Sequence, residues 1–270
     1  MIYLLPHTLQ STAERLPDQN AFQFEDEVLT YEEMVLKTNQ MAHLLLESGV
    51  RRGDRVGVYL QRSIETAIAI YGIMQAGAAY VPLDPYAPSA RTLFLLKDCG
   101  IRHLITNTSQ KRTFPDILTK TSALDQVIGI SGDWPVPSVT WEALNQFPTN
   151  NPTVRILEQD LAYIMYTSGS TGKPKGIMHT HYSGLNYAKL SADLFGLGKR
   201  DRIGSHAPLH FDISTLAYFT APLVGATSVI ISEAHTKMPA SLTELMQTEK
   251  LTVWYSVPLA LTQMLSHGLL

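Results

Sequence analysis

Apolar side chains recur along residues 31–45 at the intervals of an amphipathic helix. Thr30 and Glu33 have the spacing of an N-terminal capping box, and Gly49 stands where such a helix would end. The pattern therefore predicts a surface helix over this stretch.

Short apolar, β-branched runs between the helical segments predict strands. A strand at 55–60, a helix over 63–75 and an extended piece at 79–84 make one β-α-β unit. Because such alternation favours parallel strands covered on both faces, we expect an α/β fold of mixed, largely parallel β-sheets flanked by helices. Further strands are predicted at 103–107, 126–130, 161–167, 227–232 and 251–257.

Residues 131–153 interrupt this alternation. The segment is rich in Pro, Ser, Thr and Asn, with a short possible helix near Trp141, and predicts a surface connection between two halves. The length of 270 residues and the 45% hydrophobic content are sufficient for one large or two medium domains.

Composition excludes several classes of function. The chain has 21 basic and 24 acidic residues without runs of like charge, so we expect neither a nucleic-acid nor a membrane partner. The single cysteine, Cys99, excludes an intramolecular disulfide framework and fits a reducing cytoplasm. The histidines show no metal-binding spacing, no basic leader begins the chain, and no window approaches about 18 uninterrupted apolar residues. We predict a soluble, cytoplasmic protein without a metal site built from its side chains.

Residues 166–176, YTSGSTGKPKG, combine three glycines with several hydroxyl groups and two lysines. Small residues allow close approach of the backbone, and the polar groups favour an anion such as phosphate. A Walker loop is disfavoured, because Gly169 and Gly172 are too close together and Lys173 is followed by Pro174. A plain polar turn is the other alternative, although it requires fewer glycines and lysines than are present.

This stretch resembles, residue by residue, the signature loop of the adenylate-forming superfamily, which includes acyl-CoA synthetases, luciferases and adenylation domains of nonribosomal peptide synthetases. Segments similar to further core motifs of that superfamily occur in the same order, at 29–34, 74–84 and 211–214. The resemblance extends over nearly the whole chain and is to the N-terminal part of an amino-acid adenylation domain.

The resemblance implies ATP-dependent carboxylate activation, in which a carboxylate attacks the α-phosphate, pyrophosphate leaves and an acyl-adenylate remains. It implies catalytic roles for Thr171 and Lys175, whereas Lys173 occupies the variable position of the family motif. Mg²⁺ is implied by the triphosphate, but no carboxylate cluster identifies its ligand. The implied ATP- and phosphate-binding residues are Thr167, Ser168, Gly169, Ser170, Thr171, Gly172 and Lys175.

The resemblance also implies a site for the substrate amine. In the aminoacyl-activating members, the aspartate of Phe-Asp-x-Ser binds the α-ammonium group, and Asp212 occupies that place beside Phe211. Acyl- and aryl-CoA ligases usually lack this aspartate. The alternatives are that Asp212 caps the following helix and that Phe211 is a core residue.

By the same resemblance, Ile213, Leu216 and Tyr255 would line the side-chain pocket. Two aliphatic side chains and one aromatic ring are similar to the pocket of free-standing enzymes that load L-proline onto a carrier protein. Core packing of Leu216 and Tyr255 is an equally weighted alternative.

The later motifs of the superfamily do not occur in residues 1–270, which we therefore expect to form an incomplete large N-terminal subdomain that is inactive alone. The expected partners are an amino acid, a phosphopantetheinylated carrier protein and the missing C-terminal part, which would supply the remainder of the large domain and a lid domain. Two alternatives stay open: half of an acyl- or aryl-CoA ligase, and a non-catalytic remnant.

Overall fold

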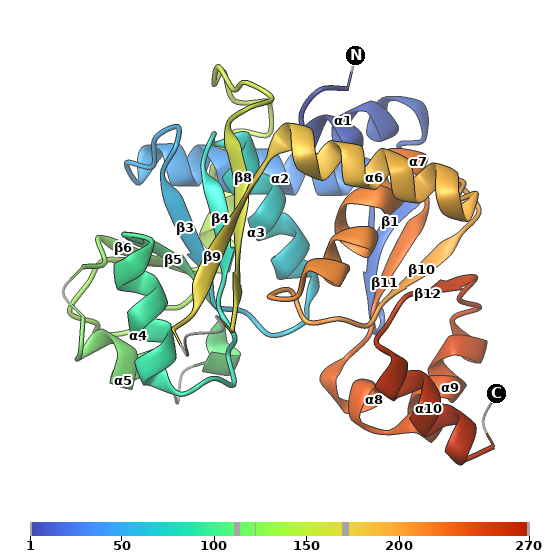
Figure 1. Ribbon diagram of the computed structural model, residues 1–270. Helices are drawn as coiled ribbons and strands as arrows, with labels where there is room; N and C mark the ends of the chain where they lie inside the picture. The colour runs from blue at the N-terminus through green and yellow to red at the C-terminus, as the bar shows by residue number, and fades with distance from the viewer. Residues whose placement is uncertain (1, 111–113, 122, 169–172, 269–270) are drawn as a thin grey trace. The chain divides into compact units, whose positions relative to one another are not determined.

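The computed structural model describes residues 2–110, 114–121, 123–168 and 173–268. The chain divides into two compact units, each of which contains one β-sheet (Figure 1). Unit 1 consists of Met1–Val35, Arg62–Ala67 and Ser183–Leu270, and unit 2 consists of Leu36–Gln61 and Ile68–Tyr182.

The sheet of unit 1 has the strand order β12-β10-β11-β1-β2 within the described residues. All neighbours are parallel except β1 and β2, which are antiparallel. Phe22 and Tyr218 stack in the core of this unit at a ring distance of 6.0 Å, and the Tyr31 hydroxyl donates to the Ala226 carbonyl. The strands are β1 (Asn20–Phe24), β2 (Glu27–Thr30), β10 (Arg202–Ser205), β11 (Thr227–Ile230) and β12 (Val253–Trp254).

Helices cover the sheet of unit 1, and Figure 1 shows α9 and α10 beside one another near the C-terminus. Helix α6 (His181–Phe195) begins at the end of unit 2 and continues through unit 1. The other helices of this unit are α1 (Pro6–Arg15), α7 (Ala221–Val224), α8 (Glu233–Lys237), α9 (Pro239–Thr248) and α10 (Pro258–Ser266).

The sheet of unit 2 has the order β7-β6-β5-β3-β4-β8-β9 within the described residues. Only the last pair, β8 and β9, is antiparallel, so β9 is an edge strand joined to β8 as a hairpin. The strands are β3 (Arg55–Val58), β4 (Ala79–Pro82), β5 (His103–Ile105), β6 (Gln126–Ile128), β7 (Ser138–Val139), β8 (Leu161–Thr167) and β9 (Lys175–Thr180).

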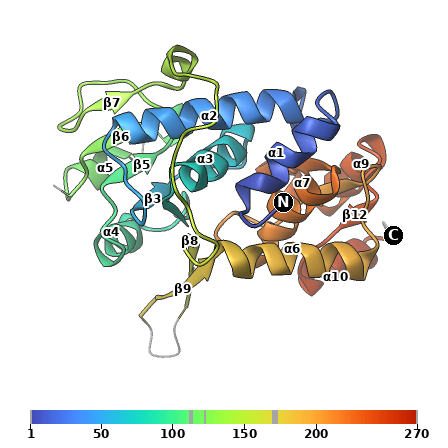
Figure 2. The same cartoon turned by 90° about the horizontal axis from the view of Figure 1, so that it is seen from above.

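Unit 2 contains most of α2 and α3, together with α4 and α5, which Figure 1 shows close to β5 and β6. Figure 2 shows the same elements from above. Residues 131–153 lie wholly within this unit, where they contribute β7 and a 3-10 helix at Trp141–Gln146, and the division between the units falls elsewhere. The helices are α2 (Tyr31–Glu47), α3 (Ile64–Gln75), α4 (Ser89–Asp98) and α5 (Phe114–Leu118).

The predicted capping box at the start of α2 is confirmed. The Glu33 N–H donates to the Thr30 hydroxyl at 3.2 Å, and the Thr30 N–H donates to the Glu33 carboxylate at 2.8 Å. Gly49 follows the helix with φ +96°, a left-handed conformation that favours glycine. These contacts explain why the sequence defines both ends of this helix.

The predicted α/β class is confirmed, since both sheets are largely parallel and flanked by helices. The strand expected at 251–257 is wrong in its length, because only β12, two residues long, pairs with β10. Five strands were not predicted, namely β1, β2, β7, β9 and β10, all of them short or polar segments whose pairing depends on distant partners.

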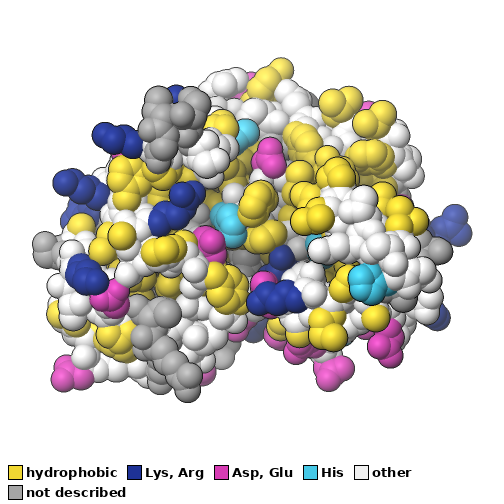
Figure 3. Space-filling view, turned by 60° about the horizontal axis from the view of Figure 1, so that its bottom comes forward, with side chains coloured by type: hydrophobic (Ala, Val, Ile, Leu, Met, Phe, Trp, Pro, Cys, Tyr) yellow, Lys and Arg dark blue, Asp and Glu magenta, His cyan; other side chains and the backbone are white. Residues whose placement is uncertain are grey.

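The surface carries charges of both signs. Figure 3 shows hydrophobic side chains scattered between basic and acidic ones on one face of the protein. None of the described helices combines the length and the apolar composition that crossing a membrane requires.

Candidate active site

The glycine- and hydroxyl-rich stretch connects the two strands of the β8–β9 hairpin in unit 2. Tyr166 pairs with Gly176, and Thr167 pairs with Lys175, so the described ends of the stretch lie in an antiparallel ladder. A Walker loop instead opens a helix, and this geometry therefore excludes that alternative. Four of the predicted phosphate-binding residues lie outside the described residues: Gly169, Ser170, Thr171 and Gly172.

The other three predicted phosphate-binding residues, Thr167, Ser168 and Lys175, have exposed side chains at the ends of this hairpin. Their side chains make no hydrogen bond or ion pair with any residue that the structure describes. Two hydroxyls and one ammonium group are thus presented to solvent from two adjacent strand ends. This arrangement can hold an anion, because each group donates a hydrogen bond and the ammonium also carries charge.

Gly176 leaves room for the ring of Tyr166, the residue with which it pairs on the neighbouring strand. A Cβ atom at position 176 would lie 3.2 Å from Cζ of Tyr166 and 3.0 Å from Cγ2 of Ile164. Both distances are tighter than ordinary van der Waals contact, so a larger residue would displace the Tyr166 ring. The final glycine of the stretch is thus explained by packing within the hairpin.

The predicted substrate-binding aspartate lies in unit 1, where Asp212–Ser214 forms one turn of 3-10 helix. The exposed Asp212 side chain accepts the N–H of the adjacent Ile213 at 2.8 Å, and the Asp212 carbonyl accepts the Thr215 hydroxyl at 2.6 Å. Phe211 occupies the N-cap position without a side-chain capping bond. The structure therefore does not show Asp212 as a helix cap, and its carboxylate can still accept further hydrogen bonds.

The interpretation of Phe211 as a core residue is wrong, because the residue is 51% exposed. Tyr255 is also outside the core, being 39% exposed, with its ring centre 6.2 Å from that of Phe195 on α6. Both aromatic rings can therefore contact a ligand.

Three of the predicted residues line one small cavity in unit 1: Ile213, Leu216 and Tyr255. The cavity has a volume of about 10 Å³, which admits roughly one water-sized group. Leu216 is 1% exposed and also packs in a core cluster with Ile203, so the pocket and core interpretations both describe it. Phe211 and Asp212 do not contribute to the wall of the cavity.

His206 forms part of the same wall and was not predicted as a site residue. Its Nδ1 lies 2.5 Å from the Ser256 hydroxyl, and its ring meets Trp254 edge-on at 5.5 Å. Its Nε2 is buried without a hydrogen-bond partner among the described residues. Burial, and secondarily the charge of Arg62, lowers the pKa of His206 to about 4, so the imidazole is neutral near pH 7. No spacing in the sequence indicates this position, because β10 and β12 bring it to the cavity.

Tyr187 on α6 was also missed. Burial is the main cause that raises its pKa, and the charges of Tyr255 and Asp212 raise it further. The phenol therefore interacts electrostatically with the two predicted substrate residues. The sequence gives no indication of this interaction, because Tyr187 lies on α6, which is separated from Asp212 by β10 and a loop.

Substituting His206 with Gln should make the thermal stability less sensitive to acid. The pKa of His206 is about 4 in the folded chain against an ordinary value of 6.5, so only the unfolded chain binds a proton between these values. Stability is therefore lost as the pH falls through this window, and the glutamine variant should lose less. Thermal unfolding from pH 7 to pH 4 would be compared with that of His267→Gln on the exposed end of α10. Parallel melting curves for wild type and His206→Gln would contradict a buried neutral histidine.

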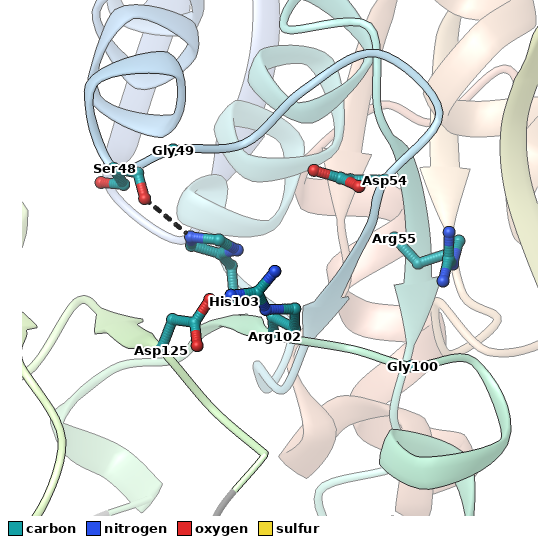
Figure 4. A pocket seen from close by; sticks show the side chains of 8 residues that line it. All are labelled: Ser48, Gly49, Asp54, Arg55, Gly100, Arg102, His103 and Asp125. Atoms are coloured by element: carbon teal, nitrogen blue, oxygen red, sulfur yellow. Dashed lines mark hydrogen bonds and ion pairs between the residues drawn. The ribbon is translucent and has the colours of Figure 1, made fainter.

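A second, polar hollow lies in unit 2 at the amino ends of β3 and β5 (Figure 4). His103 donates a hydrogen bond from Nε2 to the Ser48 carbonyl at 2.9 Å, and Arg102 forms an ion pair with Asp125 at 2.5 Å. Ligands of open parallel sheets usually bind at the carboxyl ends of the strands, so the location does not favour this hollow as the active site. Among the described residues, no group of three or more His, Cys, Asp or Glu side chains is arranged to hold a metal ion.

Comparison with known proteins identifies related sequences. The family model described as AMP-binding enzyme matches residues 9–270. The chain is 35% identical over 254 residues to zwittermicin A synthase ZmaJ of Bacillus cereus, covering 94% of this chain and 45% of that protein. It is 31% identical over 265 residues to an L-proline–[L-prolyl-carrier protein] ligase of Pseudomonas fluorescens, covering 98% of this chain and 52% of that protein. The chain spans about half the length of these relatives.

Solved structures show the same fold. The nonribosomal peptide synthetase FmoA3 with bound α-methyl-L-serine-AMP aligns with a TM-score of 0.84 and 29% identity, covering 98% of this chain and 28% of that one. The anthranilate CoA ligase AuaEII in complex with anthranoyl-AMP aligns with a TM-score of 0.87 and 25% identity, covering 95% of this chain and 50% of that one. The resemblance seen in the motifs is therefore confirmed, and the chain belongs to the family of AMP-binding, adenylate-forming enzymes.

Proposed function

We propose that the chain is the part of an amino-acid adenylating ligase that binds the substrate amino acid and the ATP phosphates. The observation that carries this proposal is the exposed Asp212 carboxylate on the segment that continues into the small cavity lined by Ile213, Leu216 and Tyr255. A carboxylate can pair with an α-ammonium group, and apolar walls accept an uncharged side chain. The relatives that are peptide synthases support an amino acid as the class of substrate.

Within this proposal, L-proline is the preferred substrate. The three predicted wall residues of the cavity are two aliphatics and a phenol, and the neutral His206 adds no charge. An uncharged, apolar side chain such as that of proline therefore suits these walls better than a charged one. The prolyl-carrier ligase at 31% identity supports the same choice.

The proposed reaction proceeds from the amino-acid carboxylate and ATP to an aminoacyl-adenylate and pyrophosphate. Thr167, Ser168 and Lys175 would bind the β and γ phosphates, together with the predicted residues outside the described part of the chain. The ammonium of Lys175 would stabilise the charge that develops on the phosphoryl oxygens. Mg²⁺ would accompany the triphosphate, and the aminoacyl group would pass to the phosphopantetheine thiol of a carrier protein.

A second candidate is an aryl-CoA ligase, because the anthranilate CoA ligase AuaEII has the same fold at a TM-score of 0.87. Asp212 argues against it, since burying a carboxylate beside a substrate without a cationic group would leave the carboxylate unpaired. The two candidates differ in the acceptor thiol as well as in the substrate.

The test is amino-acid-dependent pyrophosphate exchange with a polypeptide that carries this chain and the remaining family motifs. The common amino acids and several aryl acids would be compared, followed by transfer to CoA or to a phosphopantetheinylated carrier protein. We expect proline to be preferred and the carrier protein to be the acceptor. Preference for an aryl acid and for CoA would establish the second candidate, and preference for a bulky charged amino acid would exclude proline.

Tyr255→Ala should weaken proline activation and broaden the choice of substrate. Removing the ring enlarges the cavity, so the loss in kcat/KM for proline should correspond to about 1–3 kcal/mol, while larger apolar amino acids should be accepted better. The same exchange assay measures this, with Tyr182→Ala, which removes an exposed tyrosine of α6, as a control. An unchanged ranking of amino acids would remove Tyr255 from the pocket.

A further inference from the structure

Tyr166 joins the β8–β9 hairpin to the end of α4 within unit 2. Its hydroxyl donates to the carboxylate of Asp98, the last residue of α4, and lies 3.2 Å from Sγ of Cys99. Its ring packs against the hydrophobic core cluster of this unit, which includes Leu95 of the same helix. One side chain thus combines a polar contact to α4 with apolar packing against the core of the unit.

The Tyr166 hydroxyl, the donor in this contact, stays protonated near neutral pH. Burial, followed by the hydrogen bond to Asp98, raises the pKa of the Tyr166 phenol well above its ordinary value. Burial also raises the pKa of the Cys99 thiol. The phenol therefore keeps its proton at physiological pH and continues to donate to the carboxylate.

Tyr166 lies near the far end of the β8–β9 hairpin, where its contact with Asp98 can stabilise the strand ends. Strand β8 pairs with β4 at Tyr163 and Tyr80, whereas the β8–β9 ladder continues beyond that pair to Thr167 and Lys175. An isolated two-stranded ladder is only marginally stable in water, so its far end requires other contacts. Tyr166 supplies them immediately before Thr167 and Ser168, and directly opposite Gly176.

We propose that Asp98 is a positioning residue for ATP binding, acting through Tyr166 on the strand ends that present Thr167, Ser168 and Lys175. The proposal rests on the phosphate-binding role in the proposed function. Without the carboxylate, the Tyr166 hydroxyl would lose its acceptor, and the strand ends would sample more conformations. The cost would appear in binding of the triphosphate rather than of the amino acid, because the amino-acid residues belong to unit 1.

The chain offers a matched control at the other end of the same helix. The Asp116 carboxylate accepts the hydroxyl of Ser89, the first residue of α4, and pairs with Lys120 at 2.5 Å. Asp116→Asn therefore removes a charge from a comparable contact between α4 and its surroundings, without touching the hairpin.

The first measurement is amide hydrogen exchange on the chain itself, in wild type, Asp98→Asn, Tyr166→Phe and Asp116→Asn. Amides of residues 164–167 and 175–178 should exchange at least several-fold faster in the first two variants, with little change in Asp116→Asn. The conservative Tyr166→Phe removes only the hydroxyl, so it tests the contact even where Asp98→Asn lowers stability. Unchanged exchange in both variants would overturn the proposal, whether or not the proposed function is correct.

The second measurement is a double-mutant cycle in pyrophosphate exchange, with the polypeptide that carries the remaining family motifs. Each single variant should raise the KM for ATP about tenfold and leave the KM for the amino acid unchanged, and the double variant should be no worse than either. Equal losses for both substrates, accompanied by a lower melting temperature, would indicate a merely structural contact and overturn the proposal. If the wild-type polypeptide showed no pyrophosphate exchange, the proposed function would be refuted instead. Amide hydrogen exchange would then decide whether Asp98 and Tyr166 stabilise the hairpin.

Discussion

Replacing Asp212 with Asn is expected to abolish most amino-acid activation. The variant keeps the size of the side chain but removes the charge that, in the proposed function, would pair with the substrate ammonium, and the ammonium would be left uncompensated in the complex. The expected cost is about 3 kcal/mol in kcat/KM, or roughly a hundredfold. Pyrophosphate exchange measured over a range of amino-acid concentrations would show this loss.

Asp193→Asn is the matched control, because Asp193 is an exposed aspartate on α6 in the same unit. Its activity should equal that of wild type. If the Asp212→Asn variant showed the same dependence of pyrophosphate exchange on amino-acid concentration as wild type, the carboxylate would not bind the ammonium group. In that case the second candidate, an aryl-CoA ligase whose substrate has no ammonium group, would become the better proposal for the function.

Replacing Lys175 with Ala is expected to slow adenylate formation by roughly a hundredfold at saturating ATP. The ammonium group is exposed at the end of β9, where it would stabilise charge on the phosphoryl oxygens, and removing one preorganised contact of this kind has an effect of that size. Amino-acid affinity should change less. Thr171→Ala, outside the described residues, should have a similar effect.

Lys173→Ala provides an internal comparison for this prediction. Lys173 is also exposed, lies two residues earlier and occupies the variable position of the family motif. Its loss should change the rate much less than the loss of Lys175. Near-normal turnover in both Lys175→Ala and Thr171→Ala would refute the phosphate role, and equal effects of the two lysines would indicate a general electrostatic attraction instead.

Much of the fold could be predicted because its signals are local. The capping pair Thr30 and Glu33 and the terminal Gly49 determine α2 through contacts within a few residues. Strand β8 was predicted with its observed bounds, since its apolar run is continuous. Strand β9 was missed because Lys175 and Gly176 do not resemble strand residues, and their pairing depends on the partner strand.

In the candidate site, too, local features could be predicted from the sequence and long-range contacts could not. Sequence alone determined the composition of the predicted phosphate-binding stretch and the positions of Asp212 and its neighbours, because these are properties of consecutive residues. The resemblance had already predicted that Leu216 and Tyr255 share a pocket, but only the tertiary structure decided that His206, from the segment after β10, joins them at one cavity. It also decided that Asp98 accepts the hydroxyl of Tyr166. Such contacts join residues far apart along the chain, and their geometry exists only once the strands have paired and the helices have packed against them.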